Sequence, residues 1–222
     1  MNWKTYWNRV ALQAANIYEA VQRKDMATTL LTAKHIVHST TMAKEHKVLD
    51  LCCGNGLITK RVAPYCTHIT GVDQSEILID AAQNNNLSSN IQYLVGDVLQ
   101  VSELLKGHLF DIIYIEFSFQ YFDTYPMGKK LIAEAIQLLK PGGKLWIGDI
   151  PDKKKLFTYY NSFPKLFYLL AGKIRNKSPM GKFWSKRELL KICDKLHIKG
   201  SYLEQNSNLP YAWYRFDFLI EK

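Results

Sequence analysis

Cysteine is scarce in this chain of 222 residues, and the few cysteines form no pattern that would hold a metal or a disulfide framework. They are Cys52, Cys53, Cys66 and Cys193. None forms a C-x-x-C pair or stands near a histidine at zinc-finger spacing, so we predict no metal site. Adjacent cysteines do not easily bridge to each other, and the set is typical of reduced thiols in a cytoplasmic protein.

Long hydrophobic runs are also lacking. No stretch approaches the roughly 18 apolar residues of a membrane span. Charged side chains interrupt residues 1–23, where a signal peptide would be continuously apolar. The hydrophobic fraction of 47% and the charged fraction of 22% are ordinary for a folded chain. A chain of this length buries a large core without disulfides or metal, so the sequence predicts one soluble domain that stays in the cytoplasm.

Acidic residues are few beside the basic ones: 29 Lys and Arg face 20 Asp and Glu, a net charge of +9. The excess lies in residues 151–191, which hold eleven basic residues against Asp152 and Glu188 and leave 18 of each sign elsewhere. An imbalance of this size predicts an acidic partner, such as nucleic acid, anionic lipid or a phosphorylated metabolite.

The order of apolar patterns predicts an α/β protein. Residues 3–44 have helical spacing, with a break near Lys24 and Asp25. Short aliphatic runs typical of strands follow at 47–51, 68–72, 91–95, 110–116 and 144–150. Helical or loop segments separate these runs, and such alternation predicts a parallel sheet covered by helices on both faces. A further helix at 185–196 and two strands at 199–204 and 213–220 close the chain.

We interpret the chain as a single domain in four parts. They are an N-terminal helical cap (1–46), a cofactor-binding core (47–150), a basic and aromatic lid (151–184), and a closing helix with a β-hairpin (185–222).

The segment 48–56, Val-Leu-Asp-Leu-Cys-Cys-Gly-Asn-Gly, is typical of a nucleotide site. A strand ends there in a glycine turn and a helix begins, which brings the backbone close to a ligand. Asp73 ends the next strand about 20 residues later, where an acid can accept both ribose hydroxyls. Asp97 follows the third strand. Two plainer interpretations stay open: the glycines serve only a tight turn, and Asp73 only caps a helix.

A dinucleotide site is the main competing interpretation. Its fingerprint needs a third small residue after the glycines, but residues 57–60 are Leu-Ile-Thr-Lys. Asp50, inside the first strand, would also repel a pyrophosphate. A carboxylate there suits the positively charged end of a ligand, such as an amino group or a sulfonium.

These motifs resemble those of the class I S-adenosylmethionine-dependent methyltransferases. Residues 49–56 resemble the family's glycine-rich first motif, Gly71-Val72-Asp73 its ribose-binding strand, and Gly96-Asp97-Val98 its adenine-side acid. Residues 110–113 and 138–145 resemble its fourth strand and the turn into its fifth. The resemblance implies a Rossmann-like, doubly wound seven-stranded sheet with an antiparallel last strand, and S-adenosyl-L-methionine as the cofactor.

The resemblance also implies a role for each motif residue, although Cys52 stands where the family most often has glycine. Glu116, after the fourth strand, would meet the methionine amino group, and Asp111 is interpreted as structural. The other predicted cofactor-binding residues are Asp50, Cys52, Gly54, Asn55 and Gly56 for the methionine part, Asp73 and Gln74 for the ribose, and Asp97 and Val98 for the adenine.

The acceptor site is marked less clearly. Methyl transfer is an in-line displacement, for which the enzyme supplies orientation and, for some acceptors, a base. Asp149 is the preferred base, with a turn cap as the competing interpretation, and Glu116 is the second candidate. Residues 115–119 have neither the Asn/Asp-Pro-Pro-aromatic sequence of base-amino methyltransferases nor the Pro-Cys of cytosine C5 enzymes, which argues against DNA.

Residues 151–191 interleave their basic side chains with aromatic ones, among them Phe157, Tyr159, Tyr160, Phe163, Phe167, Tyr168 and Trp184. They form either a solvated lid whose aromatics are core or a site for a small anionic acceptor, such as a nucleotide sugar, a phosphorylated metabolite or a lipid-linked intermediate. Peripheral membrane contact by residues 156–174 and RNA binding are weaker alternatives. The sequence thus predicts an O- or N-methyltransferase, with an RNA methyltransferase or a non-catalytic binding protein as rivals, and leaves the oligomeric state open.

Overall fold

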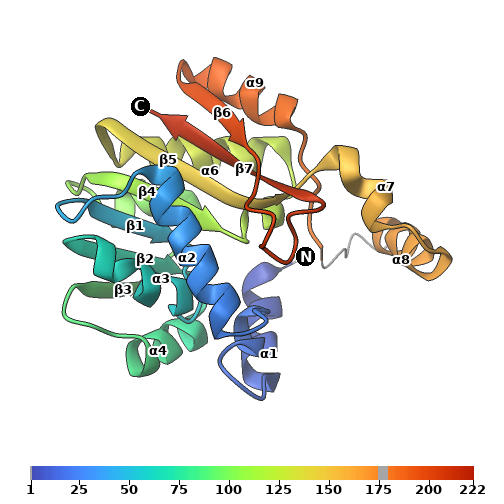
Figure 1. Ribbon diagram of the computed structural model, residues 1–222, viewed down its shortest axis with the longest axis horizontal. Helices are drawn as coiled ribbons and strands as arrows, with labels where there is room; N and C mark the ends of the chain where they lie inside the picture. The colour runs from blue at the N-terminus through green and yellow to red at the C-terminus, as the bar shows by residue number, and fades with distance from the viewer. Residues whose placement is uncertain (1, 175–179) are drawn as a thin grey trace.

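A seven-stranded sheet forms the centre of the computed structural model, which describes residues 2–174 and 180–222 (Figure 1). The strand order is β3-β2-β1-β4-β5-β7-β6. β1 to β5 run parallel, and β7 runs antiparallel to both of its neighbours. This confirms the predicted doubly wound sheet with its antiparallel last strand. The strands are β1 (Lys47–Leu51), β2 (His68–Asp73), β3 (Ile91–Val95), β4 (Phe110–Glu116), β5 (Leu139–Pro151), β6 (Lys199–Leu203) and β7 (Arg215–Glu221).

Helices cover both faces of this sheet because successive side chains of the central strands, which point to opposite faces, are apolar on each face. Val48 and Ile112 pack with α2, α3 and α4, whereas Leu49 and Ile113 pack with α5, α6 and α9. Figure 1 shows α2 on one face and α6 on the other. The helices are α2 (Met26–Thr40), α3 (Leu57–Val62), α4 (Glu76–Asn85), α5 (Val101–Leu104), α6 (Tyr125–Gln137) and α9 (Lys186–Leu196).

The N-terminal segment is less helical than predicted. α1 (Trp3–Gln13) ends well before Lys24. The side-chain oxygen of Asn16 accepts hydrogen bonds from the backbone N–H groups of Tyr18 and Glu19, and this local turn competes with the helix. A short 3-10 turn, η1 (Glu19–Val21), follows. The segment folds back, and α1 lies beside α4 (Figure 1).

Two further helices follow β5. The chain passes through the turn η5 (Lys153–Lys155) into α7 (Leu156–Tyr159) and α8 (Phe163–Ile174), which project from the side of the molecule (Figure 1). β5 itself begins earlier than predicted, at Leu139, and takes in the turn that contains Gly142, whose N–H donates to the carbonyl of Lys222 at 2.8 Å.

Candidate active site

The turn between β1 and α3 has a backbone that only small or strained residues adopt. Cys52, Gly54 and Gly56 have φ values of 63°, 55° and 75°. A Cβ atom at Gly56 would lie 2.3 Å from the hydroxyl oxygen of Tyr93, so glycine is required there. Cys52 keeps the left-handed conformation that the motif normally gives to glycine, and its N–H donates to Val72 at 2.8 Å. The turn therefore keeps its shape despite this departure.

Asp50 is buried beneath this turn. One of its carboxylate oxygens accepts hydrogen bonds from the hydroxyls of Thr59 at 2.6 Å and Tyr114 at 2.7 Å. Burial raises the pKa of Asp50 to about 7, although these two hydrogen bonds oppose the shift. A cation beside Asp50 would favour its charged form.

Asp73 joins the end of β2 to the glycine turn. Its two carboxylate oxygens accept hydrogen bonds from the backbone N–H groups of Gly54 at 3.0 Å and Ser75 at 2.9 Å. Burial raises the pKa of Asp73, and the hydrogen bonds of these N–H groups oppose the rise. Ser75, rather than Asp73, caps α4 by accepting a hydrogen bond from the N–H of Leu78. The helix-cap interpretation of Asp73 is therefore wrong.

Glu116 ends β4 with a buried carboxylate. Oxygen Oε1 accepts hydrogen bonds from both terminal nitrogens of Arg23, at 3.1 and 3.2 Å. Oxygen Oε2 is buried and has no partner among the described residues. Burial raises the pKa of Glu116 to about 8, against the opposing effect of the Arg23 guanidinium. The carboxylate thus has one oxygen left for a ligand.

A single phenylalanine next to Glu116 contacts two cations. Phe117 has a left-handed backbone with φ 57°, and the guanidinium carbons of Arg23 and Arg215 lie 5.0 and 4.7 Å from its ring centroid. Arg23 comes from the N-terminal segment and Arg215 from β7. The ring therefore links both ends of the chain to the end of β4.

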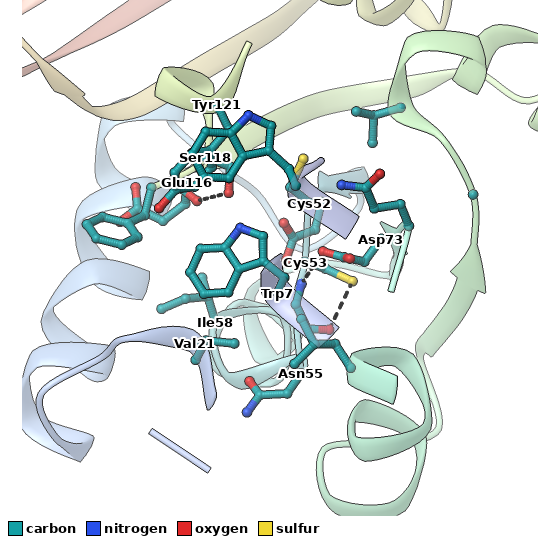
Figure 2. A pocket seen from close by; sticks show the side chains of 18 of the residues that line it. Trp7, Val21, Cys52, Cys53, Asn55, Ile58, Asp73, Glu116, Ser118 and Tyr121 are labelled. Carbon is teal, nitrogen blue, oxygen red and sulfur yellow. Dashed lines mark hydrogen bonds between the residues drawn. The ribbon is translucent and has the colours of Figure 1, made fainter. Parts of the chain in front are cut away.

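The N-terminal segment forms a roof over the strand ends. Trp3 and Trp7 contact the ring of Tyr121, with centroids 4.3 and 5.6 Å apart. The side-chain amide of Asn55 donates to the carbonyl of Ile17 at 2.6 Å. Figure 2 shows Trp7 within the ring of pocket residues, between Tyr121 and the glycine turn. The N-terminal segment and the strand ends together line a pocket of about 290 Å³.

Nearly all the predicted cofactor-binding residues meet at this pocket. Gly56 is not among the lining residues, and it acts through the shape of the turn. The cofactor-binding prediction missed Arg23, Phe117, Ser118 and Tyr121, which also line the pocket. The predicted residues that line the pocket are Asp50, Cys52, Gly54, Asn55, Asp73, Gln74, Asp97, Val98 and Glu116.

Asp149, the preferred base, does not line the pocket. Its carboxylate accepts a hydrogen bond from Gln205 at 3.2 Å and lies 3.6 Å from the guanidinium of Arg215. Its own N–H donates to Asp217, which also contacts His35 at 2.6 Å. The pairing of β5 with β7 turns Asp149 into this buried polar cluster, so the pocket lining gives no support to Asp149 as the base.

The described basic side chains of residues 151–191 do not line the pocket either, and Arg175 and Lys177 lie outside the described residues; those described are Lys153, Lys154, Lys155, Lys165, Lys182, Lys186, Arg187 and Lys191. Among the described lining residues, Arg23 is the one cation, and it is paired with Glu116. Asp111, at the start of β4, accepts from the N–H of Lys47 and from Lys140, both at 2.8 Å. It is structural, as predicted.

Within residues 2–174 and 180–222, no three His, Cys, Asp or Glu side chains stand close enough to hold a metal ion. No helix in these same ranges has the length and apolar character to cross a bilayer.

Comparison with known proteins places the pocket in a family context. Residues 48–143 match a family model described as a methyltransferase domain. The ubiquinone biosynthesis O-methyltransferase of Coxiella burnetii is 34% identical over 128 residues, which are 57% of this chain and 52% of that protein. The chain thus spans about half the length of the curated relatives it matches.

Two solved structures resemble the whole chain. The N-methyltransferase NodS from Bradyrhizobium japonicum, in complex with S-adenosyl-L-homocysteine, has a TM-score of 0.63 at 16% identity and covers 100% of this chain and 99% of its own. The magnesium protoporphyrin IX methyltransferase from Synechocystis, with bound S-adenosylhomocysteine, has a TM-score of 0.64 at 14% identity over 100% and 95% of the chains. At such identities the likeness shows the fold.

Proposed function

We propose that the protein is an S-adenosylmethionine-dependent methyltransferase, because residues 48–143 match a family model described as a methyltransferase domain and the whole chain resembles solved methyltransferase structures in its fold. It acts on an oxygen or a nitrogen of a small acceptor. One observation carries the proposal: carboxylates from the ends of β1, β2 and β4 line the same pocket as the glycine turn.

The described residues fit S-adenosylmethionine. Glu116 Oε2 and Asn55 Oδ1 are buried acceptors without a protein partner among these residues, and both side chains line the pocket. Such acceptors require donors, which the ammonium group of the cofactor provides. Asp73 stands at the end of β2, where a carboxylate can accept ribose hydroxyls. When bound, the cofactor supplies a methyl group on a sulfonium.

The protein's own contribution is orientation and exclusion of water. Trp3, Trp7 and Tyr121 cover the pocket with aromatic surface, and Phe117 and Phe122 line the same side. A covered, aromatic wall beside the end of β4 suits an acceptor with a flat apolar part. The name of the Coxiella relative, a ubiquinone biosynthesis O-methyltransferase, agrees with such an acceptor.

The anionic acceptor predicted from the charge excess has no support from the pocket lining. Arg23 is the one cation among the described lining residues, and its guanidinium is already paired with Glu116. An anionic acceptor would have to displace this buried pair, so we favour an acceptor without charge at the reacting end.

Glu116 remains as the candidate base for a hydroxyl acceptor. A general base works best when its pKa is near the operating pH, and burial raises the pKa of Glu116 to about 8. Its Oε2 would then accept the hydroxyl proton, and the cofactor's ammonium group would donate to Asn55 Oδ1 alone. An amine acceptor would leave Glu116 to hold the cofactor's ammonium group.

Calorimetry with S-adenosylmethionine and S-adenosylhomocysteine tests the cofactor. We expect micromolar binding, weakened about 10- to 100-fold by Asp73→Ala because hydrogen bonds to a charged acceptor contribute about 1.5–3 kcal/mol. Asp80→Ala, which removes an exposed carboxylate from α4, is the matched control and should bind normally. Tight NAD binding without any response to S-adenosylhomocysteine would refute the proposal.

Turnover requires a second experiment. Purified protein is incubated with S-adenosylmethionine and a metabolite extract, and S-adenosylhomocysteine is measured. An enzyme forms it only when an acceptor is present, whereas a non-catalytic binding protein forms none. Product formation that needs RNA in the extract, and that disappears after ribonuclease treatment, would support the RNA alternative instead.

A further inference from the structure

α8 turns an apolar face to solvent. Phe163 is 83% exposed, Phe167 65% and Leu170 52%. At positions i, i+4 and i+7 these side chains lie on one side of the helix. The two phenylalanines alone expose on the order of 300 Å², taking about 200 Å² for each side chain. The largest apolar patch on a typical protein surface is about 300–600 Å² and is often functional.

This face is not needed to hold α8 on the protein. Leu169 is buried in a small cluster with Tyr160, Phe183 and Tyr214, and Leu166 packs against the same cluster. The inner and outer apolar faces are therefore separate. The sequence alone does not separate them, because aromatic and basic residues are mixed along this segment. Figure 1 shows α7 and α8 projecting from the molecule, which leaves the outer face accessible.

The chain that leads into α8 supplies positive charge. Lys153, Lys154 and Lys155 are exposed, and they form no ion pair with any described residue. Phe157, two positions later, is 71% exposed. The sequence from 153 to 187 contains no Asp or Glu that could neutralise these cations. Exposed cations thus precede exposed phenylalanines in one acid-free segment.

We propose that η5, α7 and α8 are a docking surface for a membrane that carries anionic lipids. Phenylalanines that enter the headgroup region and lysines that neutralise anionic headgroups are the two parts of interfacial binding. RNA would match the lysines and could stack on the exposed phenylalanine rings, but it gives no reason for the exposed aliphatic side chain of Leu170 in the same face. A protein partner would need a groove that is both apolar and acidic. A membrane with anionic lipids accommodates both the exposed phenylalanines and the exposed lysines.

Vesicle flotation with the full chain tests the surface. Vesicles of phosphatidylcholine and phosphatidylserine in equal parts should bind the protein, and pure phosphatidylcholine vesicles should bind it far more weakly. Replacement of the three lysines 153–155 by glutamine should lower the partition coefficient on anionic vesicles by roughly a hundredfold, at about fivefold for each cation. The double variant Phe163→Gln and Phe167→Gln should lower it at least about tenfold.

Matched controls show whether the loss of vesicle binding depends on the position of the substitutions rather than on net charge or exposed hydrophobic area. Glutamine at Lys34, Lys106 and Lys130, three exposed lysines outside the segment, makes the same change in net charge, and Leu87→Gln removes an apolar side chain that is 52% exposed. Both should partition within about twofold of the unchanged protein. Equal binding to both vesicle types, or equal losses in the control triple variant, would overturn the proposal.

Two other outcomes would also overturn it. Dimers that dissociate when Phe163 and Phe167 are replaced would show that a second copy covers the face. RNA binding that depends on the same phenylalanines, without vesicle binding, would assign it to nucleic acid. Affinity for S-adenosylhomocysteine, measured in each variant, reports on the proposed enzyme function separately, because none of these residues lines the pocket.

Discussion

Gly56 and Gly142 share a backbone conformation but differ in their surroundings. Alanine at each position therefore separates the energetic cost of backbone strain from that of a steric clash. Both have φ 75°. A Cβ atom at Gly56 would lie 2.3 Å from the hydroxyl oxygen of Tyr93 and 2.7 Å from its Cζ, whereas a Cβ atom at Gly142 would have no neighbour within 4 Å. Gly142→Ala therefore carries backbone strain alone, and Gly56→Ala carries strain and a steric clash.

The magnitudes follow from these contacts. A left-handed conformation costs a non-glycine residue about 1–2 kcal/mol, which is the expected loss for Gly142→Ala. Overpacking adds about 1–3 kcal/mol, so Gly56→Ala should lower the free energy of unfolding by roughly 2–5 kcal/mol. Tyr93 donates from the same hydroxyl to the carbonyl of Asn86 at 3.0 Å, and the side-chain amide of Asn86 donates to the carbonyl of Asn55, within the glycine turn, at 2.8 Å. A displaced Tyr93 ring would therefore disturb the glycine turn as well.

Urea unfolding followed by circular dichroism measures the two losses. Calorimetry with S-adenosylhomocysteine then shows whether Gly56→Ala, and not Gly142→Ala, weakens binding. Tyr93→Phe removes the atom closest to the new methyl group, so the double variant with Gly56→Ala should recover part of the lost stability. Equal losses at the two glycines, or no recovery in the double variant, would refute the steric argument.

Three further predictions concern the pocket. The pKa of Glu116 is raised from 4.5 to about 8 in the folded chain, so between these pH values the folded chain holds a proton that the unfolded chain releases. The free energy of unfolding should therefore fall as the pH rises from 4.5 to about 8. Glu116→Gln should flatten this pH dependence in urea titrations, and an unchanged pH dependence would contradict the assignment. Burial raises the pKa values of Cys52 and Cys53 well above 9.0, so mass spectrometry should find iodoacetamide alkylation of both far slower in the folded protein than in urea; equal rates would show that the turn is open. Trp7→Ala should weaken S-adenosylhomocysteine binding about five- to tenfold, through the lost contact with Tyr121, and change the free energy of unfolding by less than about 1 kcal/mol; the reverse pattern would place Trp7 in the core.

Local pattern was sufficient to predict the sheet and most of the pocket. The alternation of strand and helix periods sets the topology, and the motif residues meet because the carboxyl ends of parallel strands share one edge. Arg23 was missed because its partner Glu116 is 93 positions away, and no local spacing indicates such a pair.

The position of Asp149 outside the pocket lining was missed for a related reason. An acid after a strand looks the same in sequence whether it faces a pocket or a neighbouring strand. Asp149 lies in the irregular stretch of the β5–β7 pairing, where the register shifts between Ile147 and Ile150, and Arg215 contacts it from 66 positions away. The buried acid in Phe216-Asp217-Phe218 was the available signal, because an acid between core aromatics needs a polar partner.

β7 also determines when the sheet can be completed during synthesis. It lies inside the sheet, between β5 and β6, although it follows both of them in the chain. While β1 to β5 leave the ribosome, β5 remains an open edge that could pair with other nascent chains. Only when β7 emerges do Phe216 and Phe218 enter the core and Arg215 reach Asp149. A chain that ends before Arg215 would therefore keep most of its strands but leave the edge of β5 uncovered, and chaperones bind such exposed edges.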